Sequence, residues 1–531
     1  MTIVQAMLLA GWHYLAYATF RGEIMHALPA ALVAGIVLGD IPTCMMIGAS
    51  VQIMYIAFTG AGGNVPNDEV GSTIMCCAVA VASGAEATQS IVLAVPIALL
   101  CGQLVTAVNA LNSMWVPFAD RAAKNGDTRK ITLCALVFPN LLKLVIMWLP
   151  MTIVLRFGTD LANQIIAAFP EWVNNGLAVL GGALPALGVA ILTNMIGQKK
   201  VMPFFFAGYF FMAYSGVSMI ALTMLGLFLA FIYYLMISQN KQVQAAPAVE
   251  EKPPVIDASV LKGDLKYKDL VKIWCRWYWA QEQSLNYERM QAIAFCYSIA
   301  PRLKKLYADD EAEYCQALQR HLEFYNSECV WGATIHGIVL ALEEEHASGE
   351  MEDTNIIVNV KTSMMGSFSA LGDTIGQSML SPLLLVSLVP LAAAGHWYAG
   401  VLYPIIFFAY RIILGTFFMR QGYQLGIKAA TQMLASGAIK MISECAGVLG
   451  LFMMGGIGAT YVTLSTPLKI PTSGTPLELQ SQIFDAIAPG IIPLAAIVGI
   501  YYLVHKGVAV WKVLVTLVVV GFVCGALGIL A

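Results

Sequence analysis

Charged residues are scarce in this sequence, and that scarcity decides the class of protein. Of the 531 residues, 11% are charged and 59% are hydrophobic, and the mean hydropathy is +0.73. Soluble globular domains carry about 25% charged residues. The composition, with its many apolar segments of helical length, therefore predicts an all-α polytopic membrane protein. A net charge of −3 also gives no basis for binding nucleic acid.

The motifs of several enzyme classes are missing as well. No Gly-rich phosphate loop ends in Lys-Ser or Lys-Thr, which argues against ATP-driven transport by this chain, and HExxH, GxSxG and HxxxH patterns are absent. The eleven cysteines include no CxxC pair and lie mostly in apolar runs, as expected for small buried side chains in a reducing compartment. We expect no catalytic residue, metal or cofactor in this chain.

The charges that are present are concentrated in one part of the chain. Residues 241–361 hold 32 of them, whereas 1–240 hold 18 and 362–531 hold 11. The central part is therefore an aqueous insert between two membrane parts. The predicted units are a membrane domain (1–237), a Pro-containing linker (238–263), and a second domain (264–531) with a helical cytoplasmic part (264–361) and a membrane part (362–531).

Several apolar segments are too short or too interrupted for a simple membrane span of ~20 residues. Segments 27–38 and 41–58 are examples, and 201–237 is long enough for two helices with a break near Ser215. Such patterns indicate broken or re-entrant helices. Clearer spans are expected at 131–155, 178–196, 379–394, 397–418, 439–464, 491–505 and 509–530.

Two short basic loops, at 121–130 and 198–200, indicate the cytoplasmic side of the membrane by the positive-inside rule. After the linker, 264–283 mixes lysine and arginine with tryptophan and tyrosine, a pattern typical of a helix that lies on an anionic membrane surface. The alternative is a soluble helix whose aromatic face enters a protein core. The composition of 284–361 is that of packed, water-soluble helices.

One apolar stretch, 35–73, contains polar side chains that a bilayer would penalise. An ionisable group in the hydrocarbon costs roughly 2.5–3.5 kcal/mol on insertion scales, so such groups usually face a protein interior or a water-filled cavity. Glycines and a proline also break the helix here, as they do where backbone lines such a cavity. We therefore predict one wall of a polar solute site. Its candidate ligands are Asp40, Gln52, Asn64, Asn67 and Asp68, with Glu69 beside them.

Two of the candidate carboxylates have a second interpretation. Asp40 follows Gly39 and is either a helix N-cap or a ligand, and the neighbouring polar residues favour the ligand. Asp373 lies in a Gly/Ser-rich entry to a membrane segment. It is either a cap at the interface or, with Gln377 on the same helix face, part of the solute lining. Because carboxylates and amides suit hydroxyl groups and no cluster of buried bases is present, we expect a neutral sugar or polyol.

The polar residues of the central part suggest no chemistry of their own. A phosphoryl-carrying side chain is expected on an exposed, soluble face, and nothing distinguishes His321, His336 or His346 from surface or structural histidines. The run of three glutamates at 343–345 is interpreted as a solvated helix end.

Both halves contain ordered motifs of one family. VLGD at 37–40, IGASVQ at 47–52, the Gly-rich turn into Pro66-Asn67 and MPFF at 202–205 resemble the enzyme IIC membrane subunit of the mannose-fructose-sorbose family of bacterial sugar phosphotransferase systems. NYERMQ at 286–291, RHLEFYN at 320–326, the glutamates at 343–345 and Gly366 followed by LGD at 371–373 resemble the enzyme IID subunit. The resemblance covers 1–237 and 264–531, so two subunits that are usually separate are joined here.

The resemblance implies a function and partners. In the family, IIC and IID together form the sugar passage, and a phosphorylated IIB protein, supplied through IIA, phosphorylates the sugar at the cytoplasmic face of the bacterial inner membrane. The phosphorylated histidines belong to IIA and IIB, so this chain is not expected to be phosphorylated. A homotrimer in the lipid bilayer and alternating access are also expected, with Asp373 near the cytoplasmic mouth orienting the hydroxyl to be phosphorylated.

The sequence departs from the family pattern at the predicted site. Many mannose-type relatives have glutamate at the position of Gln52 and aspartate at that of Asn67, whereas Asp68 and Glu69 are additional carboxylates here. These differences therefore allow a sugar other than mannose, or an amino-sugar derivative, as the substrate.

Two rival functions remain open from the sequence. One is an ion-coupled secondary sugar transporter that uses Asp40 and Asp68 as proton or Na⁺ sites. The other is a membrane-embedded transferase or a non-transporting receptor, although a transferase should show a nucleophile or a metal-binding set where the soluble and membrane parts meet.

Overall fold

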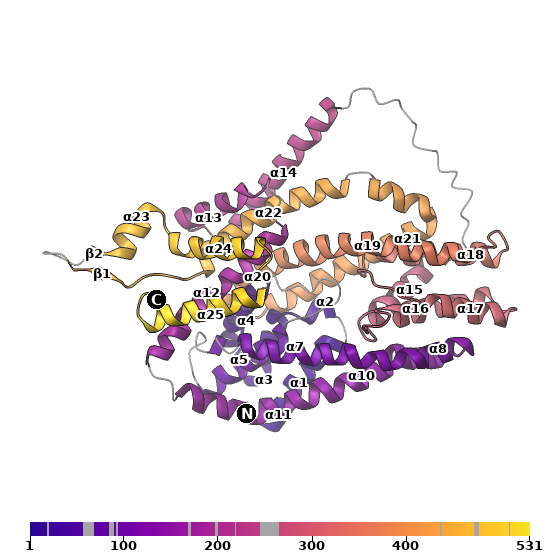
Figure 1. Ribbon diagram of the computed structural model, residues 1–531, viewed down its shortest axis with the longest axis horizontal. Helices are drawn as coiled ribbons and strands as arrows, with labels where there is room; N and C mark the ends of the chain where they lie inside the picture. Colours follow the sequence, from indigo (N-terminus) through magenta and orange to yellow (C-terminus); the bar gives the residue numbers. More distant parts are fainter. Residues whose placement is uncertain are drawn as a thin grey trace.

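The computed structural model describes residues 1–18, 21–56, 68–83, 90–91, 94–167, 171–196, 200–217, 219–244, 265–435, 438–471, 477–508 and 510–530. Within these ranges the regular structure is helical, except for one antiparallel hairpin of β1 (Lys469–Ile470) and β2 (Leu477–Glu478). Most helices run along the long axis of the molecule (Figure 1). The all-α fold expected from the sequence is confirmed. Helices suit a bilayer because they satisfy their own backbone hydrogen bonds.

The N-terminal half extends to residue 244. Its π-helical stretches η3 and η4 belong to one continuous helical segment, Thr128–Gly158. The helical elements of this half are α1 (Ile3–Ala18), α2 (Arg21–Ile24), α3 (Ala27–Leu38), α4 (Ile41–Tyr55), α5 (Glu69–Ser83), α7 (Ala94–Leu111), η2 (Asn112–Trp115), α8 (Val116–Lys124), α9 (Thr128–Thr132), η3 (Leu133–Val137), α10 (Phe138–Lys143), η4 (Leu144–Trp148), α11 (Leu149–Ala167), α12 (Glu171–Ile196), α13 (Pro203–Ser215) and α14 (Met219–Gln244).

Glycines produce two of the helix breaks that the sequence predicts in this half. The Gly-rich break predicted after α4 lies outside the described residues. Gly39 separates α3 from α4 with φ = +89°, and its N–H donates to the carbonyl oxygen of Gly35 at 2.9 Å. Gly216 ends α13 with φ = +59°. Glycine reaches this left-handed conformation without the steric penalty of a Cβ, which is why it ends helices so often.

The C-terminal half begins with the charged helices and continues into apolar ones. Its elements are α15 (Tyr267–Ala280), α16 (Ala292–Leu306), α17 (Glu311–His321), α18 (Ala333–Ala347), α19 (Asn355–Gly372), η5 (Asp373–Leu380), α20 (Ser381–Ala393), α21 (Ala399–Ala435), α22 (Ala438–Tyr461), β1, β2, η6 (Gln480–Phe484), α23 (Asp485–Ile487), α24 (Ile491–His505) and α25 (Val510–Ala526).

Three helical segments in the described part of the chain are long and apolar enough to cross a membrane: Thr128–Gly158, Ile375–Ala393 and Ala399–Gln424. A fourth arises if Gln480–Ile487 and Ile491–His505, which are bent by 59° at a short break, count as one span. Several other apolar helices, among them α3 and α4, are shorter than a span. Such short helices agree with the broken or re-entrant elements expected from the sequence.

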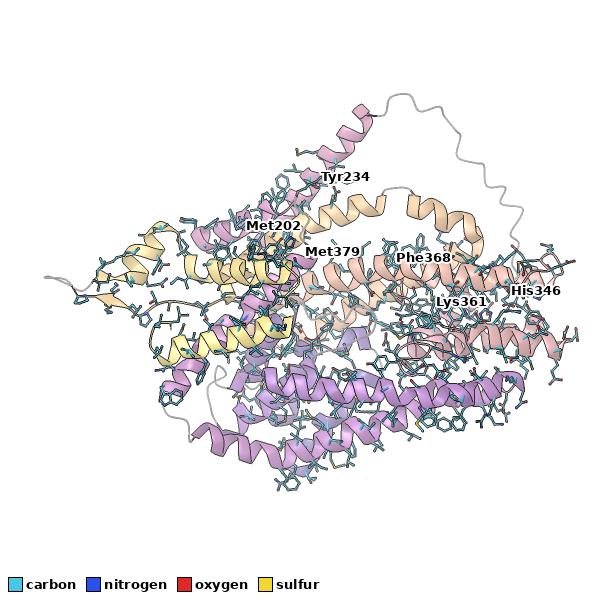
Figure 2. All side chains as sticks on the ribbon, in the orientation of Figure 1. Met202, Tyr234, His346, Lys361, Phe368 and Met379 are labelled. Atoms are coloured by element: carbon cyan, nitrogen blue, oxygen red, sulfur yellow. The ribbon has the colours of Figure 1, made fainter. Side chains whose placement is uncertain are left out.

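The two halves share a hydrophobic core. One cluster of buried side chains combines α4, α12 and α13 with α20, α21, α22 and α24. Met202 from the first half packs against this cluster, and Met379 from the second half is buried in it (Figure 2). A second cluster joins α15–α18 to α8 and η3, and these elements lie together at one end of the long axis, opposite the β-hairpin (Figure 1).

Helix α15 differs from the membrane-surface helix that its sequence suggests. Trp274 and Trp277 are fully buried, whereas Lys268 and Lys272 are exposed to solvent. The aromatic face therefore packs into the core of the charged part, and the lysines mark the solvent-exposed face. An aromatic core face is therefore present, as that alternative expects, while Tyr267 and Trp279 are exposed together with the lysines.

Two domain boundaries proposed from composition fall inside helices. Helix α14 continues to Gln244, seven residues beyond 237, and α19 runs through the boundary at 361. Polar side chains change the composition at both positions without ending a helix, because most of them are compatible with helical backbone. The rest of the linker, 245–263, lies outside the described residues.

Candidate functional site

Asp68 caps the N-terminus of α5, and its side chain contacts a histidine from α1. Its Oδ1 accepts a hydrogen bond from the N–H of Gly71 at 2.8 Å, and its Oδ2 contacts Nε2 of His13. Both side chains are fully buried. A buried carboxylate is stable only with such partners, so the helix cap and the histidine together keep this carboxylate in the interior.

Glu69, the next residue, connects Gln52 of α4 to a second histidine. Its Oε2 accepts from the Gln52 amide at 3.0 Å, and its Oε1 lies 2.7 Å from Nδ1 of His26. The Gln52 carbonyl oxygen accepts from the N–H of Leu28 at 3.3 Å, which determines which end of the amide faces Glu69. Gln52 is fully buried and Glu69 nearly so. One amide N–H of Gln52 remains for a further partner.

Asp40 caps α4, as one of its two interpretations proposed. Its Oδ1 accepts from the N–H of Thr43 at 3.1 Å. Gln52 lies twelve residues further along the same helix, which is about 18 Å at 1.5 Å per residue. The structure therefore does not bring Asp40 and Gln52 to one small ligand.

Asn64 and Asn67 lie outside the described residues, in the segment that connects α4 to Asp68. Asp373 begins the π-helical stretch η5, and its Oδ2 accepts from the Ser369 hydroxyl at 3.3 Å. Gly372 lies against Glu328, since a Cβ at 372 would come within 2.3 Å of its Oε2. Asp373 thus neighbours residues of the second half, whereas Gln52, Asp68 and Glu69 gather in the first. π-Helical turns of this kind often mark functional positions.

Polar contacts also join the two halves beside this group. Glu23 of α2 forms an ion pair with Arg411 of α21 at 3.3 Å and accepts from the hydroxyl of Tyr278. Nε2 of His26 lies 3.0 Å from the hydroxyl of Tyr403, also on α21. Burying such groups is costly unless each has a partner, so these pairs fix the two halves in one arrangement.

Five of the residues in these contacts are not among those predicted from the sequence: His13, His26, Glu23, Arg411 and Tyr403. Four of them are ionisable and lie within or beside an apolar helix. Such residues usually face a protein interior, so the sequence could have indicated that these four are buried. His13 lies in the apolar run of α1 and Arg411 in that of α21. Their partners could not be identified, since His13 and Asp68 are 55 residues apart in the chain.

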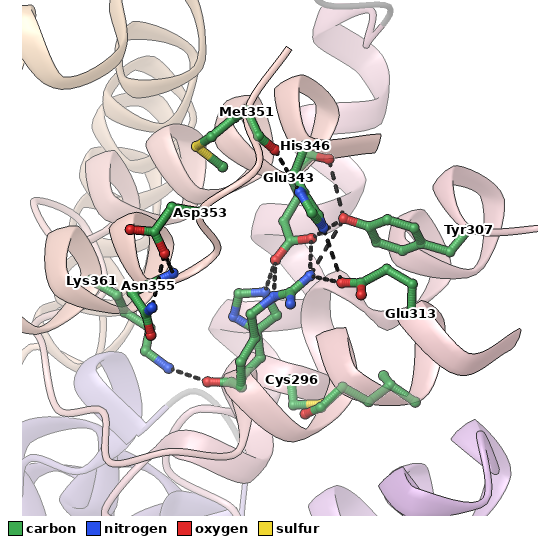
Figure 3. A network of polar contacts seen from close by, with 12 residues as sticks. Cys296, Tyr307, Glu313, Glu343, His346, Met351, Asp353, Asn355 and Lys361 are labelled. Atoms are coloured by element: carbon green, nitrogen blue, oxygen red, sulfur yellow. Dashed lines mark hydrogen bonds and ion pairs between the residues drawn. The ribbon is translucent and has the colours of Figure 1, made fainter. Parts of the chain in front are cut away.

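A second polar network lies among α16–α19 (Figure 3). Glu343 accepts from Arg320 through both oxygens, at 2.7 and 3.0 Å, from Nε2 of His321 at 2.7 Å and from Tyr307 at 2.6 Å. Glu343 is fully buried, so the interpretation of 343–345 as a solvated helix end is wrong at this position. Helix α18 packs the face that carries Glu343 against α17.

The network perturbs ionisation in this charged part. Burial raises the pKa of the Glu343 carboxyl, but the hydrogen bonds of His321 and the guanidinium of Arg320 outweigh burial and hold it well below its usual range. Burial lowers the pKa of His321 to about 4. The arrangement is a neutral histidine and an arginine around one carboxylate, without an exposed nucleophile. No group of three or more metal-ligand side chains occurs in the described ranges.

The comparisons with known proteins agree with the two halves. Residues 3–232 match the family described as "PTS system sorbose-specific iic component", and 264–530 match "PTS system mannose/fructose/sorbose family IID component", where PTS is the phosphotransferase system. The match to the IID family alone covers half of the chain.

Individual relatives show the same division. The sorbose-specific EIID component of Lacticaseibacillus casei is 33% identical over 254 residues, covering 47% of this chain and 89% of that protein. The mannose-specific EIIC component of Escherichia coli K12 is 31% identical over 225 residues, covering 42% of this chain and 83% of that protein. A solved structure described as "Structure of membrane protein" is 31% identical and covers 51% of this chain and 100% of that one, with a TM-score of 0.47. The chain therefore belongs to the mannose/fructose/sorbose family of phosphotransferase systems and contains its sugar-specific IIC and IID membrane components in one polypeptide.

Proposed function

We propose that this chain carries a sugar across the bacterial inner membrane and presents it to a separate phosphorylated IIB protein. In this proposal the sugar binds beside Gln52 and Asp68, with Asn64 and Asn67 contributed by the preceding segment. Asp40 and Asp373 contact it at other stages of its passage. A homotrimer of the chain is the expected assembly.

The observation that carries the proposal is the buried group of Gln52, Asp68 and Glu69 at the junction of α4 and α5. Two carboxylates and an amide, each held by a protein partner, lie between predominantly apolar helices. Acceptors and donors of this kind suit sugar hydroxyls. Both carboxylates already contact a histidine, so the group as a whole favours a neutral ligand over an anion.

Charge distribution supports an orientation. The basic segment 121–130 carries Arg121 and Lys124 in the last turn of α8 and Arg129 and Lys130 in α9. Helix α8 belongs to the same hydrophobic cluster as α15–α18, so this segment and the charged helices lie at one end of the molecule (Figure 1). By the positive-inside rule this end faces the cytoplasm. There it is accessible to IIB, and the β-hairpin lies on the opposite side.

Transport assays test the proposal directly. Vesicles containing the chain are given radiolabelled mannose, fructose, sorbose and glucosamine, with and without purified IIA and IIB and phosphoenolpyruvate. We expect one of the sugars to accumulate as its phosphate only when the donor proteins are present, and Gln52→Ala to raise its KM. Accumulation of free sugar on an ion gradient alone would contradict the proposal and support the ion-coupled alternative, which the family does not favour.

A further inference from the structure

A continuous line of buried and partly buried polar contacts leads from the proposed sugar site into the IID component. It runs from Gln52 to Glu69 (3.0 Å), from Glu69 to His26 (2.7 Å), and from His26 to the Tyr403 hydroxyl (3.0 Å). It ends at the Ser381 hydroxyl, 2.7 Å from that of Tyr403. The first three residues belong to IIC helices and their loops, and the last two to α20 and α21 of IID.

The chemistry of the groups gives each contact a direction. An ionised carboxylate can only accept, so Nδ1 of His26 carries a proton and donates it to Glu69. In the neutral imidazole Nε2 is then the acceptor and lies 3.0 Å from the Tyr403 hydroxyl, whose single hydrogen is shared between Nε2 and the carbonyl oxygen of Gly22, 3.2 Å away. The Tyr403 oxygen accepts from the Ser381 hydroxyl. The tautomer of His26 is thus set by its two partners, one from each component.

Packing holds the tyrosine at the centre of this line. Tyr403 is fully buried. Its ring meets the His26 ring edge-on, with centroids 4.8 Å apart, and stacks on Phe407 at 5.3 Å. Removing the hydroxyl alone would leave these ring contacts in place, so the hydrogen bond and the packing can be separated experimentally.

We propose that Tyr403 and His26 are positioning residues of the sugar site, through which the IID component orients Glu69 and Gln52 in the IIC component. Neither touches the sugar in this proposal. The hydrogen bond between Tyr403 and Nε2 fixes the orientation of the His26 ring, and with it the position of Nδ1, which faces Glu69. Metal-binding histidines are oriented in the same way by a hydrogen bond to the nitrogen that does not bind the metal. The proposal rests on the proposed function, because it assumes that the sugar contacts Gln52.

The test is Tyr403→Phe, assayed for uptake of whichever of the four labelled sugars wild type accumulates, with IIB and phosphoenolpyruvate present. The change removes the hydroxyl's contacts with His26, Gly22 and Ser381, of which the one with His26 leads to Glu69. Losing that neutral hydrogen bond predicts a rise in KM of about three- to tenfold, with Vmax per folded protein unchanged. Tyr423→Phe is the matched control. Tyr423 lies on the same helix and is also buried. The change removes hydroxyl contacts with Glu344 at 2.5 Å and with the N–H of Leu265 at 3.0 Å, and neither residue belongs to the line. Its KM should equal that of wild type.

A double-mutant cycle separates positioning from general loosening of the fold. In His26→Asn the amide N–H still reaches Glu69, but the shorter side chain cannot accept from Tyr403. The Tyr403→Phe change should therefore raise KM further by less than twofold in this background. Additive effects, or a fall in Vmax at constant KM, would overturn the proposal.

Failure of the inference is distinguishable from failure of the proposed function. If Gln52→Ala and Glu69→Gln leave KM unchanged, the sugar site itself is elsewhere. If both raise KM while Tyr403→Phe does not, the sugar site stands and the positioning role is refuted.

Discussion

At the scale of single residues, Asp40 combines a structural role with a proposed functional one, and two substitutions separate them. Asparagine caps helices as well as aspartate, whereas alanine at a cap costs about 1 kcal/mol. Asp40→Asn should therefore keep the thermal midpoint of wild type, and Asp40→Ala should lower it. Because Asp40 lies far along α4 from Gln52, we expect both variants to lower Vmax of uptake with little change in KM. Wild-type uptake by Asp40→Asn would leave capping as its only role.

Glu343 is the residue of the charged part whose loss should be most damaging. Replacing it by glutamine leaves Arg320 buried with Glu313 as its remaining carboxylate partner, at 2.7 Å. Removing one member of a buried ion pair costs about 3–5 kcal/mol, so Glu343→Gln should lower the thermal midpoint of the detergent-solubilised protein by several degrees. Glu350→Gln, at an exposed position just beyond α18, is the control and should melt like wild type.

Sequence reasoning identified residues of the candidate site better than it identified their partners. Gln52 and Asp68 were predictable because amides and carboxylates in an apolar run need a protein environment. Their partnership with Glu69 and His13 was not, since no local period relates α1 to the start of α5. Glu343 was misjudged for a related reason. Three consecutive glutamates look solvated, but only the tertiary packing of α17 shows that one of them is covered.

At the scale of elements, the packing of α17 against α18 makes the charged part sensitive to acid. The pKa of His321 is lowered by burial from 6.5 to about 4. As the pH falls below 6.5, the unfolded chain therefore binds a proton that the folded chain does not. The contribution of neutral, buried His321 to the stability of the folded state is therefore complete above pH 6.5. It declines toward pH 4 by about 1.4 kcal/mol per pH unit at most. Glu343, whose pKa is also lowered, adds a loss of the same sign below about pH 4.5.

Hydrogen exchange of α17 and α18 at pH 7.5 and pH 5.5, corrected for the intrinsic rate at each pH, measures this effect. We expect lower protection at pH 5.5 in wild type. His321→Gln retains an N–H that can donate to Glu343 but does not titrate, so its protection should change less between the two conditions. Equal changes in both proteins would assign the acid sensitivity to other groups.

Helix breaks could be predicted from the sequence at this scale, whereas helix environments could not. Gly39 and Gly216 mark their breaks because left-handed backbone favours glycine. The mixture of lysine and tryptophan in α15 fits a membrane surface as well as a protein core, and the choice depends on whether α16 and α18 cover the aromatic face. That information is not local to the helix.

At the scale of the whole molecule, the IIC and IID components interlock rather than lie as separate domains joined by a linker. Helix α13 of IIC crosses α22 of IID with glycine on both sides of the contact. A Cβ at Gly208 would come within 1.9 Å of the Phe452 carbonyl oxygen, and one at Gly455 within 2.0 Å of that of Phe205. The two backbones are therefore as close as small residues allow, an arrangement common between membrane helices.

This crossing predicts that the covalent linker is not needed for assembly. Separate expression of 1–250 and 251–531 should give two chains that co-purify through a tag on the first. Gly455→Ala in the second chain should reduce the amount recovered several-fold, because the helices must separate to admit a methyl group. Gly499→Ala, where a Cβ has nothing within 4 Å, controls for alanine in an apolar helix and should leave recovery unchanged. Halves that fail to associate would show that the fusion itself holds the components together. Association that survives Gly455→Ala would mean that the remaining contacts between the halves, such as Glu23 with Arg411, suffice without this crossing.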